Sequence, residues 1–281
     1  MYPQLSTKQQ PFNAIVSKNK KPGAYRTVTE AIAAAPVYSA TKYYIHVEAG
    51  LYKERVEVWK NKLTNIVLVG DGQLTTKISW NRRAPYFRTY DTATVLIRGD
   101  GFIAKFLTFE NSAGDGSQAV AVASLSNQSA FFQCTFLGYQ DTLHPKRGFQ
   151  FYRECNIYGT VDFIFGAAAA IFQSCNLFSR LPSTITFTAQ NKQDTNITSG
   201  FVIQNCTFTV APGMERQKPL IKAYLGRPWS DFSTVVVMES YLDDIIQPTG
   251  WLSWGNTTTD KLTYYEFRNH GPGAATSKRV N

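Results

Sequence analysis

The feature that most constrains the fold is an internal repeat built around four cysteines. Each cysteine stands in a similar phrase of apolar, polar, Cys, polar and apolar residues, as in "AFFQCTFLG" and "FYRECNIYG". The spacings are 21, 20 and 31 residues, between Cys134, Cys155, Cys175 and Cys206, and repeats of this size are typical of stacked architectures. The phrases alternate with a period of two and are rich in Phe, Ile, Val and Thr, which indicates strands. We therefore predict an all-β chain, a right-handed parallel β-helix with one coil per repeat.

Stacking of like phrases should place the four cysteines in an inward-facing column. Strands in neighbouring coils lie about 4.8 Å apart, so disulfide bonds are geometrically possible but not required. Two states remain open at this point: thiols packed as small apolar groups, and one or more bridges.

One short helix is expected near the N-terminus. In "YRTVTEAIAAAP", Thr27 and Glu30 have the spacing of a capping box, the alanines favour a helix and Pro36 ends it. We expect this helix to cover the open end of the β-helix, where bare strand edges would invite aggregation. Residues 1–14 are predicted to be an N-terminal extension and residues 15–281 a single domain, because the polar loop at 211–224 does not resemble a domain linker.

The charge of the chain narrows the class of partner. The formal net charge is +9, which favours a polyanion such as nucleic acid, an anionic membrane surface or an acidic polysaccharide. No apolar run approaches the roughly 20 residues that span a bilayer, and the N-terminus lacks the apolar core of a signal peptide. We expect a soluble chain and, if it is secreted, its mature form. Four sequons would suit a secreted glycoprotein: Asn127, Asn196, Asn205 and Asn256. Asn205 is expected inside a strand and is the poorest acceptor.

Several polar residues interrupt the apolar pattern. Asp162 lies in "GTVDFIFG", among residues typical of a buried strand, and Asp141 in "GYQDTL" precedes it by 21 residues, one coil. Coils in register would bring the two acids together, and a close carboxylate pair has its pKa values driven apart, so that one can act as an acid and the other as a base or nucleophile. Gln118 and Gln140 are 22 residues apart and should join them.

Farther along the chain, "YLGRPW" supplies a natural partner for a buried carboxylate in Arg227 and a flat surface for a sugar in Trp229. Each of these residues also has a structural interpretation. The glutamines could form an inert amide ladder, Asp141 could form a turn, Arg227 and Asp162 could be a structural ion pair, and Trp229 could belong to the core. These interpretations do not explain why so many polar groups converge on one face.

The segments "GYQDTL", "GTVDFIFG", "YLGRPW", "SQAVAV" and "GPGAATSKRV" closely resemble the signature segments of plant-type pectin methylesterases, which are β-helix carbohydrate esterases. The resemblance runs from about residue 24 to 280. It implies hydrolysis of galacturonate methyl esters in pectin (homogalacturonan), with release of methanol. It also implies that Asp162 is the nucleophile, Asp141 the general acid and then base, and Arg227 the partner of Asp162. Gln118 and Gln140 would stabilise the oxyanion.

The same resemblance suggests residues that line the polysaccharide groove: Trp229, Tyr139, Trp251, Tyr90 and Phe163. Phe163 has the core as its alternative. No metal or cofactor is expected, because no His, Cys or Gly-rich phosphate loop is needed by the mechanism. The resemblance further implies a secreted monomer of the cell wall and a proteinaceous pectin methylesterase inhibitor as a partner. The four-helix inhibitory pro-region of the family is not found, so we expect a processed form or one made without it.

The chain departs from the family pattern at three places outside the proposed catalytic groups. Ala167 follows "DFIFG" where Asn is usual, Lys192 replaces the commoner Arg in "TAQNKQD", and "FQF" at 149–151 replaces an Arg-Gln-Phe segment. These differences concern the shape of the groove and the rate. Two rivals remain: a silent wall-binding paralogue, which should have lost a catalytic group, and a pectate lyase, which needs an acidic calcium cluster that is not readable. Binding of nucleic acid or a membrane is not expected, since no recognition motif supports it.

Overall fold

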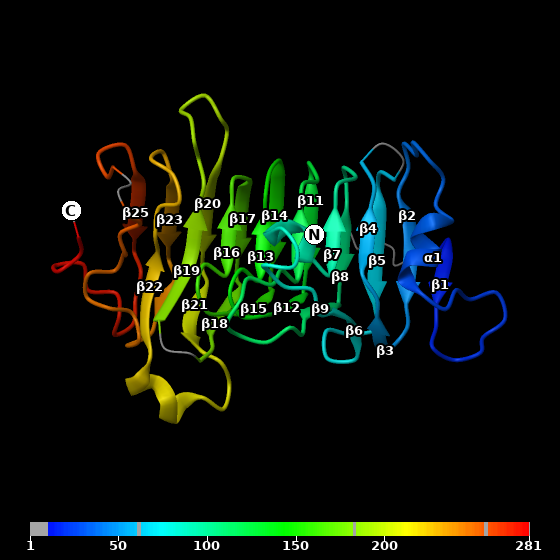
Figure 1. Ribbon diagram of the computed structural model, residues 1–281, viewed down its shortest axis with the longest axis horizontal. Helices are drawn as coiled ribbons and strands as arrows, with labels where there is room; N and C mark the ends of the chain where they lie inside the picture. The colour runs from blue at the N-terminus through cyan, green and yellow to red at the C-terminus, as the bar shows by residue number, and fades with distance from the viewer. Residues whose placement is uncertain (1–10, 61–62, 182–183, 256–257, 281) are drawn as a thin grey trace, which may run out of the picture.

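The computed structural model describes residues 11–60, 63–181, 184–255 and 258–280. Their strands stack side by side along one long axis, from β1 at one end to β25 at the other (Figure 1). Successive coils pair in parallel, as where β11, β14 and β17 meet, and the strands form three sheets. The chain is a right-handed parallel β-helix, which confirms the predicted fold class.

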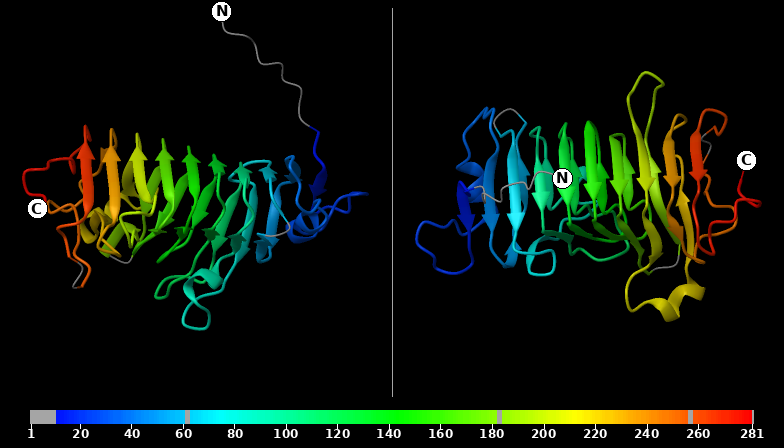
Figure 2. Two further views of the ribbon diagram at one scale, coloured as in Figure 1. Left: turned by 90° about the horizontal axis from the view of Figure 1, so that it is seen from above. Right: turned by 180° about the vertical axis from the view of Figure 1, so that it is seen from behind.

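Sheet A follows the whole length of the coil stack (Figure 2). Within the described ranges its strands, in spatial order, are β1 (Ala14–Val16), β2 (Tyr43–Val47), β5 (Ile66–Gly70), β8 (Ile103–Lys105), β11 (Ser129–Phe132), β14 (Phe149–Arg153), β17 (Ala169–Gln173), β20 (Gly200–Gln204), β23 (Thr234–Met238) and β25 (Thr263–Phe267).

Sheets B and C complete each coil. Sheet B contains β3 (Gly50–Lys53), β6 (Thr76–Trp80), β9 (Thr108–Asn111), β12 (Thr135–Leu137), β15 (Asn156–Gly159), β18 (Asn176–Ser179), β21 (Thr207–Val210) and β24 (Tyr241–Leu242). Sheet C contains β4 (Val56–Val58), β7 (Val95–Ile97), β10 (Val122–Ser124), β13 (Leu143–Pro145), β16 (Ile164–Gly166), β19 (Thr184–Gln190) and β22 (Lys222–Gly226).

The predicted helix is present as α1 (Val28–Ala33). Thr27 is its N-cap, and the Thr27 hydroxyl and the Glu30 carboxylate form the expected reciprocal capping box. Val28, Ala31 and Ile32 are buried, and the helix packs against β1, β2 and β4 at the end of the stack (Figure 1). It therefore lies over the first coils, as the sequence indicates.

Two 3-10 helices, η1 (Thr89–Thr92) and η2 (Glu215–Leu220), lie in the longer connections. The segment 211–224, expected to be a loop throughout, contains η2 and the start of β22 at Lys222. The prediction of a loop is wrong there. Polar side chains on the outward face of β22 occur within a polar segment, so the few alternating apolar residues do not indicate a strand. At the N-terminus, β1 begins at Ala14 and Phe12 stacks on His46, while most of the predicted extension lies outside the described residues.

Each cysteine follows a sharp corner between sheet A and sheet B, which we call the AB corner. The residue before the cysteine has a positive φ at each of these corners: Gln133 (48°), Glu154 (53°), Ser174 (54°) and Asn205 (53°). The period-two alternation suggested that the cysteines lie inside strands. They lie between strands instead, because the left-handed residue before each cysteine turns the chain from one short strand to the next. The turn points all four buried cysteines inward, and in the structure their thiols are free.

Side chains of one kind stack in the interior, coil upon coil. Phe131, Tyr152 and Phe172 are paired in register and fully buried, with ring centroids 4.8 Å apart for Phe131–Tyr152 and 4.6 Å for Tyr152–Phe172. Aromatic burial on this scale dominates the stability of a core. The repeat in sequence thus corresponds to a continuous column in space.

Three of the sequons lie in exposed positions, at Asn127, Asn196 and Asn205. Asn205 lies in an AB corner and not inside a strand, for the reason given above. The fourth sequon, at Asn256, falls outside the described residues. No helix in the described part of the chain is long and apolar enough to cross a membrane.

Candidate active site

Asp141 and Asp162 occupy equivalent turns in neighbouring coils. Asp141 lies between β12 and β13 with φ 64°, and Asp162 lies between β15 and β16 with φ 52°. We call this turn from sheet B to sheet C the BC corner. Leu143 pairs with Ile164, so each acid is two residues before a matched position and the two turns stack one strand spacing apart, about 4.8 Å. The 21-residue spacing is therefore one coil in register.

The turn explains why an acid can follow a buried strand. Asp is among the few residues that adopt left-handed backbone readily. Gly159, at the end of β15, is needed for the same turn, because a Cβ there would lie 2.1 Å from the Cβ of Phe163. The apolar residues of "GTVDFIFG" suggested that Asp162 lies inside a strand. It lies in a turn instead, and its side chain points away from the core.

Asp162 is held by three side-chain hydrogen bonds. Arg227 donates to both of its oxygens, from Nε to Oδ1 at 2.8 Å and from Nη2 to Oδ2 at 2.6 Å. Thr186 donates to Oδ1 at 2.7 Å and accepts from the Asp162 backbone N–H at 2.7 Å. Asp162 is 5% exposed, so this bidentate pairing stabilises a carboxylate that is almost removed from water.

Asp141 lies in a different electrostatic environment. Burial and the negative charge of Asp162 raise the pKa of Asp141 well above its ordinary value, while Arg227 opposes the shift. It too is 5% exposed. Binding of a proton is therefore favoured at Asp141, while Arg227 pairs with the carboxylate of Asp162. Such a difference in environment can separate an acid from a nucleophile.

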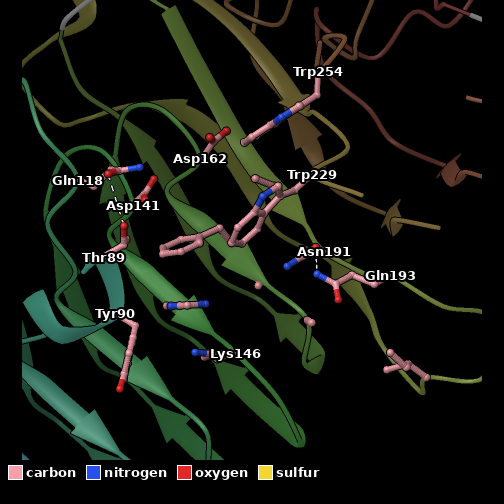
Figure 3. Close-up of a pocket in the computed structure, with 16 residues that line it drawn as sticks. Thr89, Tyr90, Gln118, Asp141, Lys146, Asp162, Asn191, Gln193, Trp229 and Trp254 are labelled. Atoms are coloured by element: carbon pink, nitrogen blue, oxygen red, sulfur yellow. Dashed lines mark hydrogen bonds between the residues drawn. The ribbon is translucent and has the colours of Figure 1, made fainter. Parts of the chain in front are cut away.

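Of the two predicted glutamines, Gln118 lines the same cleft as the acids. Its side-chain oxygen accepts a hydrogen bond from the Thr89 hydroxyl at 3.4 Å, which leaves its NH₂ directed to the side of Asp141 (Figure 3). Gln140 is partly exposed and is not among the residues that line this cleft. Its backbone oxygen accepts from Ala119 at 3.1 Å, and the role predicted for its side chain stays a prediction.

The cleft has a volume of about 560 Å³ and an aromatic wall. Trp229 stacks on Trp254 with centroids 6.3 Å apart, and Phe165 lies 6.0 Å from Trp229. The Arg227 guanidinium lies 4.0 Å from the centre of the Trp254 ring, so the aromatic wall reaches the group that pairs with Asp162. Figure 3 shows Trp254 and Trp229 next to each other in the cleft. Flat aromatic faces beside hydrogen-bonding groups suit a sugar chain.

The other aromatic residues predicted to line the groove divide into two groups. Tyr90 lies in the cleft with Trp229 (Figure 3). Phe163 is fully buried against Phe187, with centroids 5.1 Å apart, which is its alternative interpretation.

Tyr139 and Trp251 lie elsewhere. Tyr139 packs 3.8 Å from the guanidinium of Arg180 and lines a separate groove over sheet B. Trp251 is 8% exposed, packs 4.4 Å from Tyr264 and lines a smaller pocket. Tyr139 is thus in contact with the groove over sheet B, whereas Trp251 belongs to the core beside Trp254, which lines both the smaller pocket and the cleft.

Several cleft residues were not predicted: Thr89, His144, Lys146, Phe165, Asn191, Gln193 and Trp254. Phe165 stands in the quoted motif, and the repeated Trp of "WLSWG" was a usable signal for Trp254. His144 is buried against Phe165 at 4.1 Å, and burial together with Lys146 lowers its pKa to about 3, so it is neutral and serves as part of the wall. Among the described residues, no three His, Cys, Asp or Glu side chains gather as metal ligands.

The fold and site define a class of protein, parallel β-helices with a stacked aspartate pair and an arginine in an aromatic cleft. Within this class the chain belongs to the Pectinesterase family, whose model matches residues 13–281. It is 44% identical over 273 residues to "Pectinesterase 2" of Citrus sinensis, covering 95% of this chain and 53% of the relative. It is 45% identical over 273 residues to "Probable pectinesterase/pectinesterase inhibitor 17" of Arabidopsis thaliana, covering 95% and 52%. The chain thus spans about half the length of the curated relatives it matches.

Solved structures show the same similarity. "Pectin methylesterase from Carrot" superposes with a TM-score of 0.93 at 42% identity, covering 96% of this chain and 86% of that one. A pectin methylesterase in complex with a hexasaccharide superposes with a TM-score of 0.81 at 26% identity, covering 96% and 92%. The coil stack of this chain is therefore similar along nearly its whole length to those of solved pectin methylesterases.

Proposed function

We propose that this chain hydrolyses the methyl esters of galacturonate units in pectin and releases methanol. The observation that carries the proposal is the contrast between two stacked acids, an Asp162 carboxylate bound bidentately by Arg227 and a neighbouring Asp141 whose pKa is raised. Membership of the Pectinesterase family and the similarity to the carrot enzyme support the choice of substrate.

In the first step, an oxygen of Asp162 attacks the ester carbonyl and a tetrahedral oxyanion forms. The Gln118 amide is suited to donate to that oxyanion, and Gln140 is assigned the same role by family resemblance. Protonated Asp141 then gives its proton to the departing methoxide. Methanol leaves, and the galacturonyl group remains on Asp162 as an acyl-enzyme.

In the second step, Asp141 is a carboxylate and acts as a base. It removes a proton from water as the water oxygen attacks the acyl carbonyl. The bond to Asp162 breaks, the Asp162 carboxylate returns to its pairing with Arg227, and Asp141 is protonated again. The product carboxylic acid loses its proton to solvent, so each cycle restores both acids.

A methanol-release assay on highly methylated pectin tests this function directly. We expect turnover by the wild-type chain, in the presence of EDTA as well, because no step requires a Lewis acid. A chain that releases no methanol, or that cleaves the polymer only when calcium is added, would contradict the proposal, the second result favouring a lyase.

The proposed setting is secretion into the cell wall as a glycoprotein, since three sequons are exposed and the substrate is a wall polymer. We further propose a monomer in solution, tested by light scattering. A proteinaceous pectin methylesterase inhibitor is proposed as a partner, because relatives bear names that join pectinesterase and pectinesterase inhibitor. A pull-down with such an inhibitor tests this partner.

A further inference from the structure

Thr186 lies one coil beyond Asp162, at the matching position of the stack. Ile164 on β16 pairs with Thr188 on β19, and Asp162 and Thr186 each lie two residues before that pair. Thr186 is 1% exposed and is not among the residues that line the cleft. It therefore acts on a substrate in the cleft only through Asp162.

The Thr186 hydroxyl ties the backbone of Asp162 to its carboxylate. It accepts a hydrogen bond from the Asp162 backbone N–H at 2.7 Å and donates to Asp162 Oδ1 at 2.7 Å. A hydroxyl has one proton to donate, and its acceptor role toward the N–H leaves that proton for the carboxylate. The matching backbone N–H of Asp141 instead donates to the backbone oxygen of Val161 at 3.1 Å. Of the two stacked acids, the proposed nucleophile is thus the one that Thr186 clamps.

The donors divide unequally between the two oxygens of Asp162. Oδ1 accepts from the Thr186 hydroxyl and from Arg227 Nε at 2.8 Å, whereas Oδ2 accepts from Arg227 Nη2 at 2.6 Å. Each oxygen of a carboxylate offers about two lone-pair sites to donors. Both sites on Oδ1 are therefore occupied, while within the described ranges of the chain one site on Oδ2 stays open.

We infer that Thr186 is a positioning residue that selects Oδ2 of Asp162 as the attacking oxygen. This inference rests on the proposed function and specifies how its nucleophile is aimed. A lone pair of Oδ2 forms the bond to the ester carbon, while the electron pair of the carbonyl double bond moves to the carbonyl oxygen of the ester.

The same hydrogen bonds serve the second half of the reaction. When methoxide leaves with the proton of Asp141, the acyl-enzyme is an anhydride in which Oδ2 is the bridging oxygen and Oδ1 a carbonyl oxygen. Oδ1 keeps its hydrogen bonds from Thr186 and Arg227. These donors therefore stabilise the carboxylate that forms again when water releases the product.

The test replaces the hydroxyl by a methyl group in Thr186→Val, which keeps the branched shape of the side chain. We expect kcat for methanol release to fall about 10- to 100-fold, the scale of one lost hydrogen bond to a charged group and of a displaced reacting atom. KM should change little, because Thr186 does not line the cleft. Thr186→Ser keeps the hydroxyl and should restore most of kcat.

Thr76→Val is the matched control. The Thr76 hydroxyl is also buried, accepts from the Asp71 backbone N–H at 3.1 Å and donates to Val47 O at 3.4 Å. Thr76 lies on β6 in sheet B, outside the cleft. This variant should lose similar stability in thermal melting but keep its kcat, so it separates a damaged fold from a misdirected nucleophile.

A crystal structure tests the choice of oxygen directly. Asp141→Asn treated with an activated aryl ester of galacturonate should accumulate the acyl-enzyme, with the acyl bond on Oδ2 of Asp162 and with Oδ1 still bonded to Thr186. An acyl bond on Oδ1, an unchanged kcat in Thr186→Val, an equal loss in Thr76→Val or no recovery in Thr186→Ser would overturn the inference. If the wild type releases no methanol, the proposed function fails. Crystal structures of the wild type and Thr186→Val then still decide whether the hydroxyl fixes the Asp162 carboxylate, which we expect to rotate when the hydroxyl is lost.

Discussion

The AB and BC corners use the same backbone conformation for opposite purposes. Glu154 at an AB corner has φ 53° and Asp162 at a BC corner has φ 52°. At the AB corner the left-handed side chain stays near the surface, where Glu154 accepts from Gln133 at 2.8 Å, and the next residue, Cys155, fills the core. At the BC corner the left-handed residue itself carries the proposed catalytic carboxyl group.

The difference comes from what covers each corner. Glu154 is partly exposed, whereas Asp162 is buried. The side chains of Arg227 and Trp254 come from two separate connections, after β22 and after β24, both more than 60 residues later in the chain. Arg227 pairs with Asp162, and Trp254 packs on Arg227. Later segments of the chain thus remove the turn residue Asp162 from water and supply its counterion, which makes it a candidate for a reactive group.

The largest expected effect on methanol release is that of a substitution at the BC corner. Asp162→Asn keeps the size of the side chain and its tolerance of positive φ, but it removes the proposed nucleophile. Methanol release should fall by roughly 10⁴-fold or more, while the protein remains folded by circular dichroism and still binds pectin.

Glu154→Gln is the control for this change, since it makes the same acid-to-amide replacement at the same φ. It should leave methanol release unchanged and cost less than about 1 kcal/mol of stability. Near-normal turnover in Asp162→Asn, or unfolding in place of lost activity, would mean that Asp162 is a structural acid like Glu154.

The next effect separates the two acids of the BC corner from each other. Asp141→Asn removes the general acid and should lower methanol release by about 10² to 10⁴. An activated aryl ester needs no proton on its leaving group, so this variant should still acylate Asp162, which would appear as a burst of phenol followed by slow turnover. No burst, with the loss equal for methyl and aryl esters, would argue against the acid role.

A smaller effect concerns stability. The pKa of Asp141 is raised in the folded state by burial and by Asp162, so its carboxyl favours folding fully only below the unfolded value near 3.9, and this contribution is lost as pH rises through the folded pKa. Asp141→Asn should therefore melt at a higher temperature than the wild type, by a margin that grows above about pH 4. The difference in melting temperature between the variant and the wild type, at roughly 2–4 °C per kcal/mol for this chain length, measures how far the Asp141 carboxyl destabilises the fold at each pH.

Asp243 provides the opposite sign in the same experiment. Burial opposes ionisation there, but Lys218 at 2.6 Å and Thr209 bind the carboxylate, and its pKa is lowered. Its contribution is present above the unfolded pKa and lost as pH falls through the folded one. Asp243→Asn should thus lower the melting temperature at neutral pH and have less effect in acid. The same sign for both variants would contradict the assignment of Asp141.

Sequence reasoning found the parts of the site that repeat. Asp141 and Asp162 were predicted as a pair because one coil separates them, so that their spacing in sequence gives their spacing in space. Tyr139 was misplaced because it lies close to a left-handed residue, where the alternation of faces fails. Trp254 and Lys146 belong to no repeat, and their positions depend on contacts with Trp229 and Tyr90 that no local pattern encodes.

The smallest expected effect sharpens the comparison at the AB corner, where the inward residue only has to fill space. Ser240 occupies the position of Cys206 one coil later, following Glu239 with φ 53°, and its hydroxyl donates to Met238 O at 2.9 Å. Cys206 makes the matching contact to Gln204 O at 3.3 Å. Cys206→Ser should therefore cost less than about 1 kcal/mol of stability, measured by thermal melting with and without a reducing agent, and it should leave methanol release unchanged.

A bridged Cys206 would behave differently, because loss of a native disulfide typically costs about 2–5 kcal/mol and the reducing agent would then destabilise the wild type as well. A large, reductant-dependent loss would show that this corner is cross-linked, whereas a small one would show that serine and cysteine are equivalent where the left-handed turn serves packing alone.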